Sequence, residues 1–213
     1  CGGTHVRASG EVGVVAIRSW ERFKGGTRVG FVCGGRAVRI LASLGGVVDA
    51  CVAKLSAQPS ELADAIGRLQ EQHTEARRWG KLLNEALMGA EAVARDASAR
   101  LIGGCRLIAE IFPDRPADDV QLLARKYTMT PGRVALLASL DPVTGKASMV
   151  FARSDEGVPA ELKMGEILAH VCRSRGGKGG GGASFARGGG IGAEDAQGAI
   201  EEATAVVAAR LGS

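Results

Sequence analysis

Residues 59–101, PSELADAIGRLQEQHTEARRWGKLLNEALMGAEAVARDASARL, carry a continuous seam of positions that steps by three and four residues alternately. Such heptad spacing is typical of a long helix with one stripe suited to packing. The seam residues are Leu62, Ile66, Leu69, His73, Ala76, Gly80, Leu83, Leu87, Ala90, Ala94, Ala97 and Leu101. Ser60 is a candidate N-cap for this helix.

The seam is imperfect in two ways. His73 and Gly80 occupy seam positions where an apolar side chain would pack, and alanine occupies most seam positions near its C-terminal end. We therefore expect a helical hairpin or a weak coiled coil rather than a strong permanent dimer. A break near Gly80 would give two antiparallel helices that cover each other. The same segment could support a weak homodimer.

Short apolar stretches alternate with glycine-containing turns before the seam. Residues 12–17, 29–32 and 38–41 predict strands, and residues 24–27 and 34–35 predict tight turns, because glycine accepts the positive φ that such turns need. This β-rich piece is too short for a whole domain, so its partner strands are expected before Cys1.

The pattern of the sequence changes again after Gly103-Gly104, where a third segment begins. Residues 106–112, 133–140 and 147–152 predict strands, and residues 116–127, 161–172 and 193–211 predict helices, with a loop over 173–192. Strands alternating with helices are typical of a compact α/β domain. The expected fold class is therefore mixed α+β and α/β, divided into a partial β-rich domain (1–54), a helical connector (55–102) and an α/β domain (103–213).

Composition and charge narrow the function classes. The formal net charge of +4 is compatible with a phosphate-rich partner without demanding one. No apolar run approaches the ~20 residues of a membrane span and no secretion signal begins the chain, so we expect a cytoplasmic protein. The 5 cysteines are widely spaced and odd in number, which predicts reduced thiols. A first residue of Cys rather than Met favours a fragment.

The opening Cys1-Gly-Gly-Thr-His5 places a thiolate and an imidazole four residues apart, across a turn that can point both at one ion. Two ligands do not complete a zinc site, since structural zinc takes about four protein ligands and catalytic zinc about three plus water. Spacing alone leaves open a buried thiol beside a turn histidine.

Residues 173–190, RSRGGKGGGGASFARGGG, alternate glycines with cationic side chains. Glycines let backbone N–H groups approach an anion closely, and the cations add charge. A phosphate-backbone contact is predicted, although a flexible linker is the alternative. The candidate contact residues are Arg173, Arg175, Lys178, Gly179, Gly180, Gly181 and Arg187.

Cys1-Gly-Gly-Thr-His5-Val6, with residues 9–13 and 26–37, resembles the second zinc-ligand segment of the alanyl-tRNA editing domain, which occurs in alanyl-tRNA synthetases and in free-standing alanyl-tRNA editing proteins. In that family an upstream His-x-x-x-His motif completes the site, and this sequence lacks it. The resemblance implies that Cys1 and His5 bind zinc. It implies hydrolysis of serine or glycine from mischarged alanine tRNA, with zinc holding a water or positioning the substrate amine.

The missing motif implies a chain that starts midway through the editing domain and by itself binds without catalysing.

Residues 162–165 and the glycine-rich segment resemble the terminal globular domain shared by alanyl-tRNA synthetases and certain phosphoesterases, with Arg187 where that family has glutamine. Alanine tRNA is the implied partner. The order of the three parts matches long editing proteins, and residues 24–35 are closer to the free-standing ones. The alternatives are a non-catalytic RNA-binding or dimerisation module, or a phosphoesterase substrate-binding domain.

Overall fold

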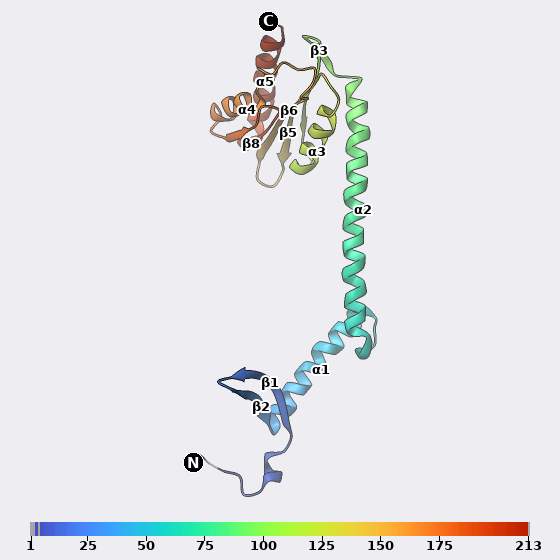
Figure 1. Cartoon of the computed structure of the whole chain (residues 1–213), viewed down its shortest axis with the longest axis vertical. Coiled ribbons are helices and arrows are strands. Elements are labelled where there is room, and N and C mark those ends of the chain that lie inside the picture. Colours follow the sequence, from blue (N-terminus) through green and yellow to red (C-terminus); the bar gives the residue numbers. More distant parts are fainter. Residues whose placement is uncertain (1–2, 4, 213) are drawn as a thin grey trace. The chain divides into compact units, whose positions relative to one another are not determined.

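A computed structural model describes residue 3 and residues 5–212 (Figure 1). It divides the chain into two compact units, Cys1–Ala76 and Arg77–Ser213. Helices, a two-stranded sheet and a six-stranded sheet confirm the predicted mixed α+β class. The division into three parts at 54/55 and 102/103 stays a prediction.

The first unit contains a β-hairpin. After a short 3-10 turn, η1 (Ser9–Val12), strands β1 (Val15–Phe23) and β2 (Gly26–Cys33) pair antiparallel. Lys24 and Gly25 connect them with φ values of 46° and 80°. Two successive positive φ angles are those of a two-residue hairpin turn whose twist matches the strands. The predicted strand over 29–32 and the turn before it are confirmed. The strand predicted over 12–17 is confirmed only over its second half, since β1 begins at Val15 and continues to Phe23.

Helix α1 (Gly35–Leu55) follows, so the predicted strand over residues 38–41 is wrong. The helix starts directly after Gly34, which has a φ of 60°. Val38 and Leu41 are three residues apart, as the apolar face of a helix requires, and Gly45-Gly46 hid the continuation of that pattern.

Helix α2 (Leu62–Asp96) follows the turn η2 (Pro59–Glu61) and runs without a break through Gly80, so the predicted helical hairpin is wrong. A single glycine costs a helix only about 1 kcal/mol relative to alanine, and α2 contains no proline to enforce a break. Gln58, rather than Ser60, occupies the N-cap position of this helical stretch.

The second unit is built on one sheet with the order β3-β4-β5-β6-β8-β7. Strands β4 and β5 are parallel, and the other neighbours are antiparallel. The strands predicted over 106–112, 133–140 and 147–152 are confirmed, whereas β3, β7 and β8 were not expected. The bounds are β3 (Arg100–Ile102), β4 (Cys105–Phe112), β5 (Arg133–Asp141), β6 (Lys146–Arg153), β7 (Lys178–Gly181) and β8 (Phe185–Gly192).

Helices cover both faces of this sheet (Figure 1). Helices α4 (Met164–Arg173) and α5 (Ala196–Leu211, after the turn η3, Ala193–Asp195) enclose one aliphatic core with the sheet. Helix α3 (Ala117–Thr128) encloses the other, joined by Met88 and Ala92 of α2. The three predicted helices of this part of the chain are confirmed.

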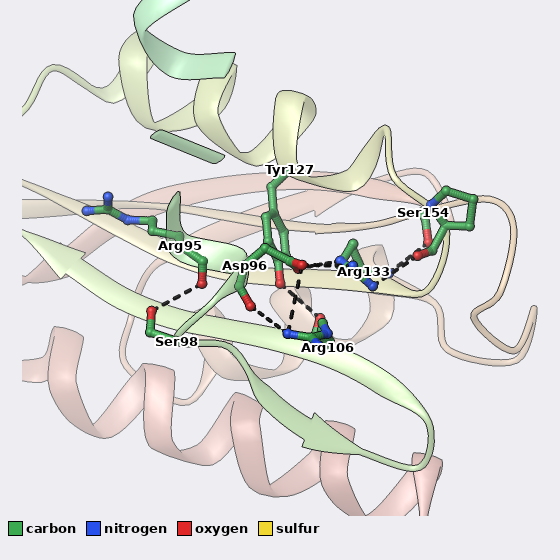
Figure 2. A network of polar contacts seen from close by, with 8 residues as sticks. Arg95, Asp96, Ser98, Arg106, Tyr127, Arg133 and Ser154 are labelled. Carbon is green, nitrogen blue, oxygen red and sulfur yellow. Dashed lines mark hydrogen bonds and ion pairs between the residues drawn. The ribbon is translucent and has the colours of Figure 1, made fainter. Parts of the chain in front are cut away.

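A polar cluster ties the end of α2 to the sheet (Figure 2). The Asp96 carboxylate accepts a hydrogen bond of 2.9 Å from Arg133 Nη2, and its backbone carbonyl accepts one of 2.7 Å from Arg106 Nη1. The Tyr127 hydroxyl donates to the Arg106 carbonyl at 3.4 Å. Burial first, and then the Asp96 charge, raise the pKa of Tyr127, so its hydroxyl stays a donor. The cluster therefore joins α2, α3, β4 and β5.

Among the described residues, no single helix is long and apolar enough to cross a membrane. Helix α1 and residues 59–98 meet the length and composition criteria only when taken together as a bent pair.

Candidate nucleic-acid interface

The glycine-rich segment is a β-hairpin rather than the predicted loop. Strand β7 is the edge strand, and β8 lies between it and β6. The turn is tight, since Gly182 N donates to the Phe185 carbonyl at 2.9 Å. Glycine has no side chain to show the alternation that identifies a strand, and the pairing that defines β8 comes from β6, which is distant in sequence.

The inner face of this hairpin packs on α4. A Cβ at Gly188 would lie 2.8 Å from Cys172 Sγ and 2.9 Å from Gly179 Cα, and one at Gly179 would lie 3.1 Å from the same sulfur. Burial raises the pKa of the Cys172 thiol, against a smaller lowering by Arg175, so the group is a neutral packing partner. Gly179 and Gly188 therefore let helix and sheet approach closely.

The first turn of α4 is closed by the same hairpin. Met164 N donates to the Ala183 carbonyl at 2.9 Å, and Gly165 N donates to the Gly182 carbonyl at 3.1 Å. A Cβ at Gly181 would lie 2.5 Å from Ala186 Cα. These amides already have partners and Gly181 is tightly packed, so this side of the hairpin offers little room for a phosphate.

The opposite face of the hairpin is open. Lys178 lies opposite Gly189, and Arg187 lies opposite Gly180, so these four residues share one face. Both cationic residues are exposed, and a Cβ at Gly180 would meet nothing within 4 Å. We call these four residues the outer strip: two exposed cations beside two glycines, of which Gly180 is open and Gly189 lies against Ser148.

The other two predicted cations are placed differently. Arg175 Nη1 lies 2.6 Å from Glu202 Oε2, and the Arg175 side chain is only 19% exposed, so a carboxylate already balances its charge. Arg173 is exposed and ends α4, on the helix that covers the opposite face of the sheet. The structure thus brings Lys178 and Arg187 together and leaves Arg173 and Arg175 apart from them.

Sequence reasoning missed one cation on the open side. Arg125 of α3 lies with its guanidinium carbon 3.9 Å from the centroid of the Phe185 ring. Phe185 is two residues before Arg187 on β8, so both point to the same face. The phenylalanine, one of only 5 in the chain, was a visible signal. Arg125 gave no such signal, because its contact with Phe185 depends on α3 lying over β8 in the folded chain.

The predicted zinc pair is only half within the described residues. Cys1, like Thr4, lies outside them, and His5 is exposed ahead of η1. In the described part of the chain, no group of three or more His, Cys, Asp or Glu side chains is arranged to hold a metal ion. The described residues therefore do not form a complete site for zinc, which needs about three protein ligands or more.

Known proteins resemble this chain over most of its length and over a limited part of their own. No family model matches it. Alanine-tRNA ligase of Parafrankia sp. (strain EAN1pec) is 35% identical over 196 residues, covering 89% of this chain and 22% of that protein. Alanine-tRNA ligase of Acidothermus cellulolyticus is 32% identical over 216 residues, covering 100% of this chain and 24% of that protein. The chain thus spans less than a quarter of the length of these curated relatives.

Among solved structures, the C-Ala domain from Aquifex aeolicus alanyl-tRNA synthetase resembles this chain with a TM-score of 0.45 and 23% identity. The superposition covers 54% of this chain and 98% of that domain.

Proposed function

Because the chain is homologous to the C-terminal region of alanine-tRNA ligase, we propose that it binds the sugar-phosphate backbone of alanine tRNA through the outer strip. The observation that carries the proposal is the exposed pair Lys178 and Arg187 beside Gly180 and Gly189. No ion pair joins either cation to another described residue. Such a role is that of a cytoplasmic protein, as the sequence predicts.

The chemistry of the outer strip suits a phosphate. Cationic side chains neutralise phosphates and release their counterions, which supplies affinity without sequence selectivity. Backbone N–H groups are common phosphate donors, and an edge strand such as β7 carries a row of them. Since Gly180 and Gly189 have no side chains, an RNA backbone can come close to the strand. Affinity for a particular tRNA then has to come from further contacts.

The proposal is tested by titrating an alanine tRNA transcript with the chain at one salt concentration. The double variant Lys178→Ala/Arg187→Ala should bind at least tenfold more weakly, because each lost phosphate contact removes counterion release. The matched control is Arg100→Ala/Arg210→Ala, which removes two exposed cations on β3, at the opposite edge of the sheet, and on α5. Equal weakening in both double variants would reject the outer strip and leave only general charge attraction.

Zinc-dependent removal of serine or glycine from mischarged alanine tRNA is the finer form of the hypothesis. It depends on Cys1 and His5 as metal ligands and on further ligands that the described residues do not supply. We therefore derive no catalytic step and expect this chain to bind without hydrolysing. The test is the zinc content and deacylation rate of an active longer protein and of its Cys1→Ala variant. Unchanged values would remove Cys1 from the site.

Self-association through α2 is a second candidate function. Leu83 and Leu87 of the predicted seam are 66% and 60% exposed, while Met88 and Ala92 of the same helix are buried against the sheet. Two leucines one turn apart on the outward side are suited to a second copy of α2. Sedimentation should detect a weak dimer that Leu83→Lys abolishes. A monomer at every concentration would reject this role.

A further inference from the structure

A cleft of about 450 Å³ lies beside Phe185, at the end of β8 next to the outer strip. Helix α3 and the segment after it contribute Arg125 and Met129, and the segment after β6 contributes Asp155 and Glu156. The volume falls within the range of about 300–1,000 Å³ typical of sites for small molecules. None of the predicted contact residues and none of the four residues of the outer strip lines this cleft.

One wall of the cleft offers a flat surface. The Arg125 guanidinium lies over the Phe185 ring at 3.9 Å, and Arg125 is exposed, so the ring holds one face of the guanidinium and the other can receive a ligand. Met129, 75% exposed, adds apolar surface nearby. Unstacked bases pack on arginine planes and aromatic rings in this way, because both present a broad, polarisable face.

The other wall carries two exposed carboxylates that accept hydrogen bonds, and Arg153, which also lines the cleft, is buried. Asp155 and Glu156 are exposed and line the cleft, and within the described residues neither forms an ion pair. Carboxylates accept hydrogen bonds from the exocyclic amino group of cytosine and repel phosphate. Arg187 lies two residues along β8 from Phe185, about 6.6 Å at 3.3 Å per residue, and can take the phosphate instead.

We propose that this cleft receives one unstacked nucleobase with an exocyclic amino group, stacked on Arg125, while its phosphate lies on the outer strip. The base can belong to an unpaired nucleotide of RNA or to a free mononucleotide, since both present the same chemistry. The RNA form rests on the proposed function. The mononucleotide form does not, because Arg125, Asp155 and Glu156 act on the base.

Calorimetric titration with cytidine and uridine monophosphates tests the cleft directly. Cytidine monophosphate should bind more tightly than uridine monophosphate, which carries no amino group. Arg125→Lys keeps the charge and removes the planar face, so it should weaken binding of cytidine monophosphate about tenfold, as expected for loss of one base stack. Asp155→Asn/Glu156→Gln should abolish the preference for cytidine. Arg100→Ala, an exposed cation on β3 at the opposite edge of the sheet, is the control and should change nothing.

RNA hairpins with and without one unpaired cytidine separate this inference from the proposed function. The unpaired cytidine should improve wild-type affinity and should not improve that of Arg125→Lys. Binding that depends on Lys178 and Arg187 but gains nothing from the cytidine overturns the cleft and leaves the outer strip intact. Binding of cytidine monophosphate that depends on Arg125, without any RNA binding, supports the cleft and rejects the outer strip. Equal binding of cytidine monophosphate by wild type and Arg125→Lys overturns the cleft.

Discussion

Two alanine substitutions in the same hairpin should have opposite consequences, although the sequence gives no reason to separate them. Gly188→Ala would place a Cβ 2.8 Å from Cys172 Sγ and 2.9 Å from Gly179 Cα, closer than real Cβ atoms approach. Because backbone is involved, the strand or α4 has to shift, and overpacking of this kind costs about 1–3 kcal/mol. Gly180→Ala meets nothing within 4 Å. It should be neutral or stabilising by up to about 1 kcal/mol, since alanine loses less backbone entropy.

Urea unfolding followed by circular dichroism measures both effects. The midpoint for Gly188→Ala should fall clearly below that of the wild type, with an unchanged dependence on urea, and thermal unfolding should shift by about 2–4 °C for each kcal/mol lost. Gly180→Ala should unfold like the wild type and yet bind RNA more weakly, because its methyl group covers the outer strip. Equal stability of the two variants would refute the assignment of inner and outer faces.

Other predictions concern the rest of the second unit. Asp96→Ala should lower the free energy of unfolding by about 1.5–3 kcal/mol, because it removes a charged hydrogen-bond partner from Arg133; denaturant titration checks this, with Asp118→Ala as an exposed control. The pKa of Asp141 lies below its ordinary value because Thr144 Oγ1 and two backbone amides donate hydrogen bonds to its carboxylate. The stabilisation that these hydrogen bonds give the folded state is therefore fully present above the ordinary pKa of an aspartate. It is lost as the pH falls through the lowered pKa of the folded state. Thr144→Val should move that pKa upward in a carboxyl NMR titration; an unmoved value would contradict the role of the hydroxyl.

The sequence predicts much of the second unit because its strands carry strong apolar signals. Residues such as Val134–Ala138 and Met149–Ala152 are buried on both faces, so their continuous apolar runs predict strands directly. The predicted helices were also recovered, although their observed ends differ by a few residues. These patterns depend only on the side chains of each segment, so the strands and helices can be predicted without knowledge of the fold.

Glycine is the common cause of the errors. Gly34-Gly35 predicted a turn at the start of α1, residues 38–41 between the two glycine pairs predicted a strand, and Gly80 suggested a break that α2 does not have. In β7 and β8 the glycines removed the alternation that would have shown a strand. The sequence shows only that a glycine has no side chain. The group that fills the space beside the glycine belongs to an element distant in sequence, as the Cys172 sulfur does beside Gly188.

The candidate site could be predicted only in part for the same reason. Composition identified Lys178 and Arg187 among four cations, but the pairing of Arg175 with Glu202 depends on α5 lying beside α4. The stacking of Arg125 on Phe185 depends on α3 covering one face of the sheet. Charge and glycine content therefore located the segment, and the sheet register selected the residues within it.

The salt dependence of tRNA affinity tests the central claim most directly. For the wild type, the logarithm of the association constant should fall linearly with the logarithm of salt concentration, and removing two phosphate contacts should reduce the slope by about 1.4–1.8. At ~0.1 M salt this corresponds to a loss of roughly 25- to 60-fold relative to a 1 M reference. We predict this change for Lys178→Ala/Arg187→Ala and not for Arg100→Ala/Arg210→Ala. An unchanged slope in the first double variant would contradict the outer strip as the contact with RNA.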